Sequence, residues 1–191
     1  MTGHTLVLAS ASPRRLALLA QIGIVPDRVV PTEIDESPLP RELPRAHAVR
    51  LARAKAAAAD APACFVLAAD TVVGAGRRIL PKAETEAEAR TCLTLLSGRR
   101  HRVTTAVVLQ APDGRRAERV VESVVTFARL APAQLRAYLD SGEWRGKAGG
   151  YAIQGRAASF IRFLSGSYSN VVGLPLFETA QLLRGHGWAL P

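Results

Sequence analysis

The stretch TLVLASASPRRLALLAQIGI, residues 5–24, contains in order a buried strand, a turn and a helix. LVLA has the apolar character of a short buried strand, and LALLAQIG has the spacing of an amphipathic helix. Ser12 occupies the N-cap position, and Pro13 occupies the first helical position, where a missing N–H costs nothing. Gly23 suits the C-terminal end of the helix. The stretch therefore predicts a strand–turn–helix unit with its turn at SASPRR.

The first turn of this helix carries Arg14 and Arg15, although the positive end of the helix dipole disfavours cations. Unpaired backbone N–H groups and the dipole make a helix N-terminus an anion site. Arginine adds bidentate, charge-assisted hydrogen bonds to phosphate, and Ser10 and Ser12 add hydroxyl donors. The turn therefore predicts a phosphate site. The alternative is an ordinary Ser-Pro cap with two solvated arginines, because the turn lacks the full P-loop and dinucleotide fingerprints.

Further along the chain, apolar runs of strand length alternate with helical patterns. Strands are predicted in residues 27–40 (running into an open loop), 64–73, 102–110, 116–130 and 158–173, and helices in 47–61, 84–98, 132–142 and 175–187. Pro112, Asp113 and Gly114 form the turn of a hairpin. This alternation, with a hairpin in the middle, predicts an α/β domain that contains a mixed sheet.

The size and composition of the chain bound its class. The 191 residues are 48% hydrophobic, which predicts one domain over residues 1–191, folded as two lobes. No apolar run has the length of a membrane helix, and the N-terminus lacks a signal-peptide pattern. Cys64 and Cys92 have no metal-ligand spacing, so we expect two reduced core thiols in a cytoplasmic protein.

The net charge is +9, from 25 Lys+Arg against 16 Asp+Glu. A basic surplus attracts phosphates, either on nucleic acid or on a nucleotide. The arginines are scattered, and only 5% of the residues are aromatic, so the stacking stripe typical of a single-strand binder is missing. Charge alone does not choose between the two kinds of ligand.

Asp70 ends the apolar run CFVLAAD, and α/β proteins place ligand sites at the carboxyl ends of strands. Such a carboxylate can bind a metal or act as the general base for a water molecule. Capping of a turn through Thr71 explains it equally well. Glu33 in TEIDES is a further carboxylate and Lys82 in ILPKAE a further cation, although each alone is typical of a solvated surface.

KAGGYAIQG, residues 147–155, is rich in glycine, so its backbone can approach a ligand closely. Lys147 adds a cation, and the amide of Gln154 offers donors and an acceptor that fit the edge of a base or a ribose hydroxyl. A glycine-rich loop with a structural amide is the alternative. The four histidines lie in unlike contexts without a nucleophile elbow, and no Cys/His spacing suits zinc. The sequence thus carries no signal for a serine or zinc hydrolase.

Four segments together, ASASPRR, AADTVV, KAGGYAIQG and GSYSNVVGLPL, resemble the Maf family of nucleoside triphosphate pyrophosphatases over nearly the whole chain. The resemblance implies an elongated mixed sheet with flanking helices and two lobes around a central cleft, similar to the inosine triphosphatase fold. It also implies hydrolysis between the α and β phosphates with a divalent cation, Mg²⁺ or Mn²⁺. The YAIQG and SYSNVVGLPL forms are similar to the dTTP/UTP branch rather than the 7-methyl-GTP branch.

The resemblance also assigns roles to residues. Asp70 corresponds to the family's proton acceptor, and Arg14, Thr71 and Gln154 correspond to positions for substrate choice. The other polar positions that are expected to line the cleft are Ser10, Arg15, Glu33, Lys55, Lys82 and Lys147.

The hypothesis is therefore an enzyme that hydrolyses dTTP, UTP and modified pyrimidine nucleotides to the monophosphate and pyrophosphate. Glu33 and Asp70 would hold the metal, Asp70 would activate water, and Lys82 would join them in catalysis. The alternatives are a non-catalytic nucleic-acid-binding protein and a purine or 7-methyl-GTP pyrophosphatase of the same fold. The expected partners are the nucleotide and a second copy in a homodimer, with no membrane and no nucleic acid.

Overall fold

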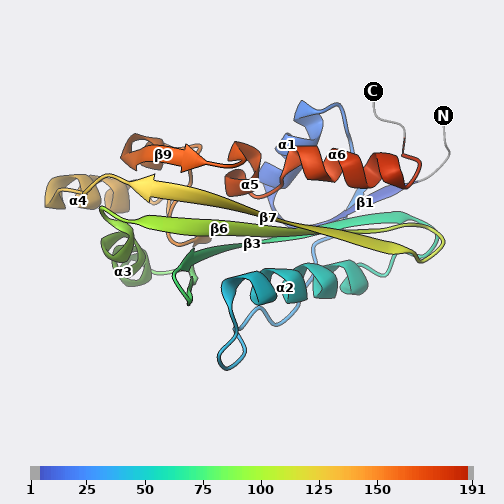
Figure 1. Cartoon of the computed structure of the whole chain (residues 1–191), viewed down its shortest axis with the longest axis horizontal. Coiled ribbons are helices and arrows are strands. Elements are labelled where there is room, and N and C mark those ends of the chain that lie inside the picture. The colour runs from blue at the N-terminus through green and yellow to red at the C-terminus, as the bar shows by residue number, and fades with distance from the viewer. Residues whose placement is uncertain (1–4, 189–191) are drawn as a thin grey trace.

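The computed structural model describes residues 5–188 and shows an elongated molecule built around one long, twisted sheet (Figure 1). The sheet has seven strands in the path β2-β1-β3-β6-β7-β9, with β4 paired to β3 off this path. A separate pair joins β5 to β8. Parallel and antiparallel pairings both occur, so the predicted mixed α/β sheet with flanking helices is confirmed.

The strands are β1 (Leu6–Ala9), β2 (Arg28–Val29), β3 (Phe65–Ala75), β4 (Arg78–Leu80), β5 (Lys82–Ala83), β6 (Arg100–Gln110), β7 (Arg116–Phe127), β8 (Lys147–Ala148) and β9 (Ile161–Ser165). The helices are α1 (Pro13–Gln21), α2 (Pro44–Ala58), α3 (Glu86–Leu96), α4 (Pro132–Ser141), the 3₁₀ helix η1 (Arg156–Phe160), α5 (Tyr168–Val172) and α6 (Leu176–Gly185).

The edge of β3 that faces β1 has a notch. β1 runs parallel to β3 and its last residue, Ala9, pairs with Ala68. β4 pairs with β3 only from Val73 onward, whereas β6 pairs with β3 continuously through this region. Among the described residues, no strand therefore pairs with residues 69–72 on the β1 side. The notch lies where the chain leaves β1 for α1.

The two faces of the sheet pack against different helices. Figure 1 shows α2 on one face and α1, α5 and α6 on the other. Val66, Ala68 and Val72 of β3 belong to the core under α2, while Leu67 and Ala69 belong to the larger core opposite. Because both faces of β3 are buried, the strand reads in sequence as a continuous apolar run rather than an alternating one.

Three sequence predictions are corrected by the structure. The strand predicted over 158–173 is wrong, because only Ile161–Ser165 is a strand, η1 precedes it and α5 follows it. The chain turns at Gly166 with φ 107°, and the Ser167 hydroxyl then caps α5 by accepting from the Asn170 N–H. The strand within 27–40 is limited to Arg28–Val29. Ser12 stands at the N-cap of α1, but its side chain makes no capping hydrogen bond.

The helices predicted from 47, 84, 132 and 175 onward are present with shifted ends. Cys92 is buried, Cys64 is partly buried, and both are free thiols. No helix within residues 5–188 is long and apolar enough to span a membrane. The division of residues 1–191 into one domain with two lobes stays a prediction.

Candidate active site

At the notch, two neighbouring side chains of β3 point to opposite faces of the sheet, because side chains alternate along a strand. Asp70 points toward α2, where its Oδ1 lies 2.6 Å from the Lys55 Nζ. Thr71 points toward α1, where its hydroxyl accepts a hydrogen bond from the Arg15 guanidinium. Asp70 is only 2% exposed, so the predicted carboxylate at the strand is a buried charge paired with a lysine.

A cavity of about 640 Å³ opens over the notch. It is lined by the turn into α1, by Asp70, Thr71 and Val73 of β3, by Val103 of β6, by Lys82, by residues of segment 143–155, and by residues 171–173 at the end of α5. A second cavity of about 200 Å³ on the α2 side shares Asp70, Thr71 and Lys82 with the first. The larger volume falls within the range of small-molecule sites, and Asp70 borders both spaces.

Arg15 is buried and its guanidinium is used within the protein. Nε donates to the Gly173 carbonyl at 2.8 Å, Nη1 to the Ser10 hydroxyl at 3.1 Å and Nη2 to the Thr71 hydroxyl at 3.2 Å. Burial lowers its pKa, while the charge of Asp70 acts in the opposite direction. The structure thus brings Arg15 and Ser10 to the site, but their hydrogen bonds serve to connect α1 to β3 and to the end of α5.

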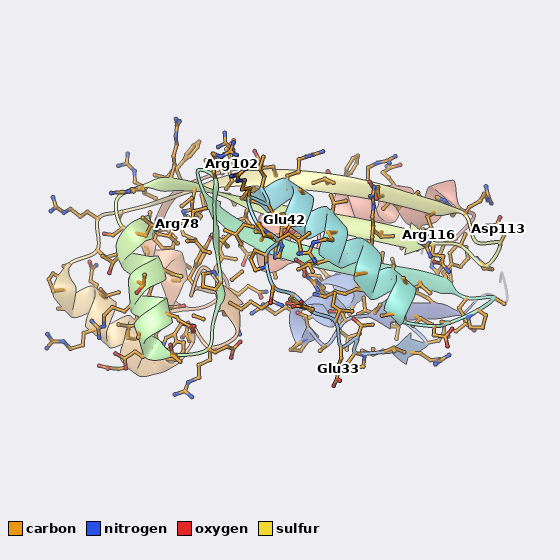
Figure 2. All side chains as sticks on the ribbon, turned by 90° about the horizontal axis from the view of Figure 1, so that it is seen from below. Glu33, Glu42, Arg78, Arg102, Asp113 and Arg116 are labelled. Atoms are coloured by element: carbon orange, nitrogen blue, oxygen red, sulfur yellow. The ribbon has the colours of Figure 1, made fainter. Side chains whose placement is uncertain are left out.

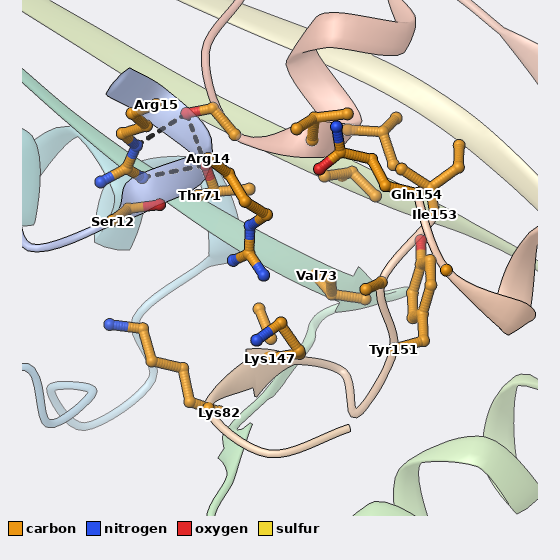
Figure 3. Close-up of a pocket in the computed structure, with 18 of the residues that line it drawn as sticks. Ser12, Arg14, Arg15, Thr71, Val73, Lys82, Lys147, Tyr151, Ile153 and Gln154 are labelled. Carbon is orange, nitrogen blue, oxygen red and sulfur yellow. Dashed lines mark hydrogen bonds between the residues drawn. The ribbon is translucent and has the colours of Figure 1, made fainter. Parts of the chain in front are cut away.

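Arg14, in contrast, extends into the cavity beside Lys147, and Lys82 lies below them (Figure 3). Its Nε is buried and finds no hydrogen-bond partner among the residues that the structure describes. Burial lowers the pKa of Arg14; burial, and then repulsion by Arg14, lowers the pKa of Lys147. The charge of Lys147 is thus disfavoured by burial and by Arg14, and an anion in the cavity would favour it.

Carboxylates and lysines alternate along the other side of the notch. Lys55 Nζ lies 2.6 Å from Asp70 Oδ1 and 2.7 Å from Glu36 Oε1. The second oxygen of Glu36 pairs with Lys82. The row Asp70–Lys55–Glu36–Lys82 therefore connects β3, α2, the loop before α2 and β5. Lys55 and Asp70 have side chains that are 7% and 3% exposed, so water screens their pair weakly.

Glu33 is placed outside this site. Its side chain is exposed and points outward in Figure 2, and it lines neither cavity that contains Asp70. The carboxylate that reaches Lys55 and Lys82 is Glu36, three residues later. TEIDES contains several acids without regular structure, so the sequence offered no signal for choosing among them.

Glu42 fixes the loop that carries Glu36. Its carboxylate accepts from the Leu39 N–H, pairs with His47 and Arg50 of α2, and is nearly buried. Arg50 also donates to the Ser37 carbonyl at 2.8 Å. The hydrogen bond from Arg50 holds the pKa of Glu42 well below its usual value, although burial acts in the opposite direction. No local pattern in the sequence marks this anchor, because the partners of Glu42 lie on a different element.

Acid should weaken the ion pairs of Glu36 in a defined range. Burial raises its pKa, but hydrogen bonds from Lys55 and Lys82 outweigh this and bring it from 4.5 to about 2. A lowered folded-state pKa stabilises the protein above the unfolded value and loses that effect as the pH falls through the folded value. We expect the gap in unfolding free energy between wild type and Glu36→Gln to be constant above pH 4.5 and to shrink toward about pH 2. Denaturant unfolding across this range measures it, and a gap independent of pH would contradict the pairing.

The far end of the cavity is formed by Tyr151, Ile153 and Gln154 (Figure 3). Gly149 and Gly150 before them have positive φ values of 67° and 70°. A Cβ on Gly149 would lie 2.9 Å from Val73, so glycine is required there both by backbone and by space. The glycine-rich loop thus packs on β3 and brings the exposed amide of Gln154 to the cavity.

Fold and site together define an α/β protein with a cation-lined cavity over a buried carboxylate. The family model described as Maf-like protein matches residues 5–186. The chain belongs to the Maf family.

The chain is 66% identical to the dTTP/UTP pyrophosphatase of Granulibacter bethesdensis over 203 residues, covering 98% of this chain and 95% of that protein. It is 63% identical to the dTTP/UTP pyrophosphatase of Caulobacter vibrioides over 188 residues, covering 97% of each. Among solved structures, the Staphylococcus aureus Ham1 protein matches 65% of this chain and 72% of its own with 18% identity and a TM-score of 0.43.

Proposed function

We propose that this protein is a nucleoside triphosphate pyrophosphatase that acts on dTTP and UTP, with modified pyrimidine nucleotides as further substrates. The observation that carries the proposal is one cavity that holds both the Arg14 guanidinium, whose Nε has no partner among the described residues, and the Asp70 carboxylate. The cation suits a polyphosphate, and the carboxylate suits activation of water. The names of the relatives support the same activity.

The phosphate chain would lie between Arg14, Lys82 and Lys147, whose charged groups face one space in Figure 3. Arginine can bind two phosphate oxygens at once, and the lysines act as point charges. The sequence predicted that Arg15 and Ser10 bind phosphate. In this proposal they instead fix the turn that carries Arg14. Lys55 remains behind Asp70 and keeps that carboxylate in place.

A divalent cation fits the residues that are present. Lys55 pairs with Asp70 through Oδ1 at 2.6 Å and with Glu36 through Oε1 at 2.7 Å, so the two carboxylates lie close together. With Lys55 in place, the cation would bind beside it, to the second oxygen of Asp70 and to Glu36. The described residues contain no group of three or more His, Cys, Asp or Glu that could hold a metal alone. Mg²⁺ is commonly bound by one or two carboxylates together with substrate phosphates. We therefore assign Mg²⁺ or Mn²⁺ to Asp70 and Glu36, in place of Glu33; when bound, it would neutralise phosphate charge.

The chemistry of the protein's own residues follows from their places. Asp70 would orient the attacking water and take its proton at a carboxylate oxygen. Lys55 holds the other side of the carboxylate, so its direction toward the notch is fixed. Lys82 and Arg14 would stabilise the charge that develops on the departing pyrophosphate. The water oxygen forms a bond to the α-phosphorus, and the bond from the α-phosphorus to the oxygen that bridges it to the β-phosphorus breaks. That oxygen leaves with pyrophosphate, and the nucleoside monophosphate remains.

Base choice is assigned to Gln154. Its amide can pair with O4 and N3–H of uracil or thymine, because it offers both an acceptor and donors. Thr71 was expected to contribute, but its hydroxyl is occupied by Arg15 at 3.2 Å and Thr105 at 2.9 Å. Thr71 would therefore influence substrate choice indirectly, by accepting the hydrogen bond that keeps Arg15 in place.

Gln154→Ala should raise KM for UTP and dTTP more than KM for CTP. A lost hydrogen bond at a partly desolvated site costs about 1–3 kcal/mol, or roughly 5- to 150-fold in KM. Steady-state pyrophosphate release with the three nucleotides measures the ratio. The control is Gln181→Ala, an exposed glutamine on α6. Equal losses for all three bases would show that Gln154 supports the loop rather than reading the base.

The proposed function is tested by a nucleotide panel assayed for pyrophosphate with and without Mg²⁺ or Mn²⁺. We expect saturable, metal-dependent release from UTP and dTTP, and much slower release from purine triphosphates and 7-methyl-GTP. The reverse order would favour the purine alternative. No release, together with affinity that rises with oligonucleotide length and falls steeply with salt, would favour a nucleic-acid-binding protein. A cytoplasmic location and a homodimer are further parts of the proposal, which fractionation and light scattering can check.

A further inference from the structure

The segment that carries Gln154 has little regular structure of its own. Between β8 and η1, residues 151 and 152 have no regular structure and residues 153–155 form a turn, with the Gly155 N–H donating to the Ala152 carbonyl. Side chains from other elements hold it. Tyr138 of α4 accepts a hydrogen bond from the Ala152 N–H at 3.3 Å, and His101 of β6 bonds the Tyr151 hydroxyl at 2.8 Å. The orientation of the base-reading amide thus depends on residues outside its loop.

Glu143 makes the shortest of these contacts. Its Oε2 accepts from the Arg156 N–H at 2.7 Å, directly after the turn, and its Oε1 lies 3.5 Å from the Arg156 Nε. Glu143 also lines the same cavity as Gln154. The Glu143 carboxylate therefore ties the end of the turn to the segment that follows α4. Gln154 lies two residues before Arg156, whose N–H the carboxylate binds.

The backbone of Glu143 is itself fixed by the end of α4. Gly142 ends the helix in the left-handed region with φ 69°, and the Ser141 hydroxyl accepts from the Glu143 N–H at 3.3 Å. The next residue, Trp144, is 3% exposed and its indole donates to the Leu139 carbonyl at 2.8 Å. The backbone that carries Glu143 is therefore fixed by hydrogen bonds and by the buried Trp144, and is not a free loop.

The Glu143 carboxylate can reach the Arg156 N–H only because residue 155 has no side chain. A Cβ on Gly155 would lie 2.1 Å from the Glu143 Oε2, whereas its φ of −105° is open to any residue. Glycine at position 155 thus makes room for the carboxylate and is not required by the backbone conformation. Alanine at this position would push the carboxylate away and break its bond to Arg156.

We propose that Glu143 is a positioning residue that holds the 152–156 turn so that Gln154 meets the base. The inference rests on the proposed function for the identity of the ligand. It places part of the selectivity for uracil and thymine in the turn after α4, outside the glycine-rich motif. If Glu143 instead touched the nucleotide itself, its loss would add to the loss of Gln154.

The test measures the affinity of the full chain for α,β-methylene-UTP, which keeps the base and cannot be cleaved at the scissile position. Glu143→Ala and Gly155→Ala should each raise Kd about tenfold, the effect of roughly one hydrogen bond. Affinity for tripolyphosphate, which has no base, should stay within about twofold because these variants leave Arg14 and the lysines intact. Glu143→Gln keeps an oxygen that can accept from Arg156 and should recover most of the affinity.

A double-variant cycle separates positioning from direct contact. Glu143→Ala in the Gln154→Ala background should cause no further loss, because the residue acts through Gln154. The controls are Glu122→Ala, which removes an exposed ion pair with Arg102, and Gly185→Ala, where a Cβ meets no atom within 4 Å. Thermal unfolding checks that each variant folds, and Gly155→Ala carries the test if Glu143→Ala does not.

Additive losses in the cycle, or Kd values for both single variants equal to that of wild type, would overturn the positioning role. Equal losses for α,β-methylene-UTP and tripolyphosphate would overturn it as well. A wild-type chain that binds the analogue but releases no pyrophosphate from UTP would overturn the proposed function and leave the positioning role standing. A chain that neither binds the analogue nor releases pyrophosphate from UTP would overturn both.

Discussion

Asp70→Asn is expected to yield a protein that still binds UTP but releases pyrophosphate about 10³-fold more slowly, within the range for loss of a general base. Asparagine has nearly the same shape, but its amide cannot take a proton from water. Lys55 keeps Glu36 as a partner at 2.7 Å, so the buried ammonium is not left alone. The fold and the cations that face the phosphates should therefore persist.

Single-turnover pyrophosphate release with saturating UTP measures the chemical step, and binding of α,β-methylene-UTP measures affinity separately. Asp140→Asn, an exposed carboxylate of α4, is the matched control and should behave as wild type. Turnover retained by Asp70→Asn would remove Asp70 from the chemistry. Loss of binding in parallel with turnover would assign it to substrate or metal binding alone.

Arg15→Lys is expected to destabilise the protein by about 2–4 kcal/mol, because hydrogen bonds to a buried charged group are strong and are expensive to leave unmade. The guanidinium serves three acceptors at once, on Ser10, Thr71 and Gly173. A single ammonium cannot reproduce that planar arrangement. In a protein of this size, the loss corresponds to a fall in Tm of roughly 4–16 °C.

Arg14→Lys is the matched comparison, since it makes the same exchange one residue earlier. Arg14 has a buried Nε without a hydrogen-bond partner among residues 5–188, so its replacement should change stability by less than about 0.5 kcal/mol. It should instead weaken binding of UTP and tripolyphosphate alike, because the bidentate contact with phosphate is lost. If Arg15→Lys were as stable as wild type, or if Arg14→Lys were the less stable of the two, the assignment of the two arginines would be reversed.

The sequence by itself determined the elements whose signals are local. The strand and helix on either side of SASPRR, the hairpin turn at Asp113 and Gly114, and the end of α4 at Gly142 follow from apolar spacing and from residues that favour caps and turns. Where signals conflicted, the prediction was wrong: apolar residues in 158–173 suggested one strand, although Gly166 and the Ser167 cap divide it. The site residues Asp70, Arg14 and Gln154 were also found at this level, and all three line the cavity.

Only the tertiary structure decided how the charges are divided. Arg14 and Arg15 are neighbours in sequence, yet Arg15 is bonded to a carbonyl 158 residues away and Arg14 faces the cavity. Glu36 rather than Glu33 meets Lys55 because the loop is anchored to α2 through Glu42 and Arg50. The physical reason is that the free energy of a buried charge is set by partners from distant segments, which no local pattern of residues encodes.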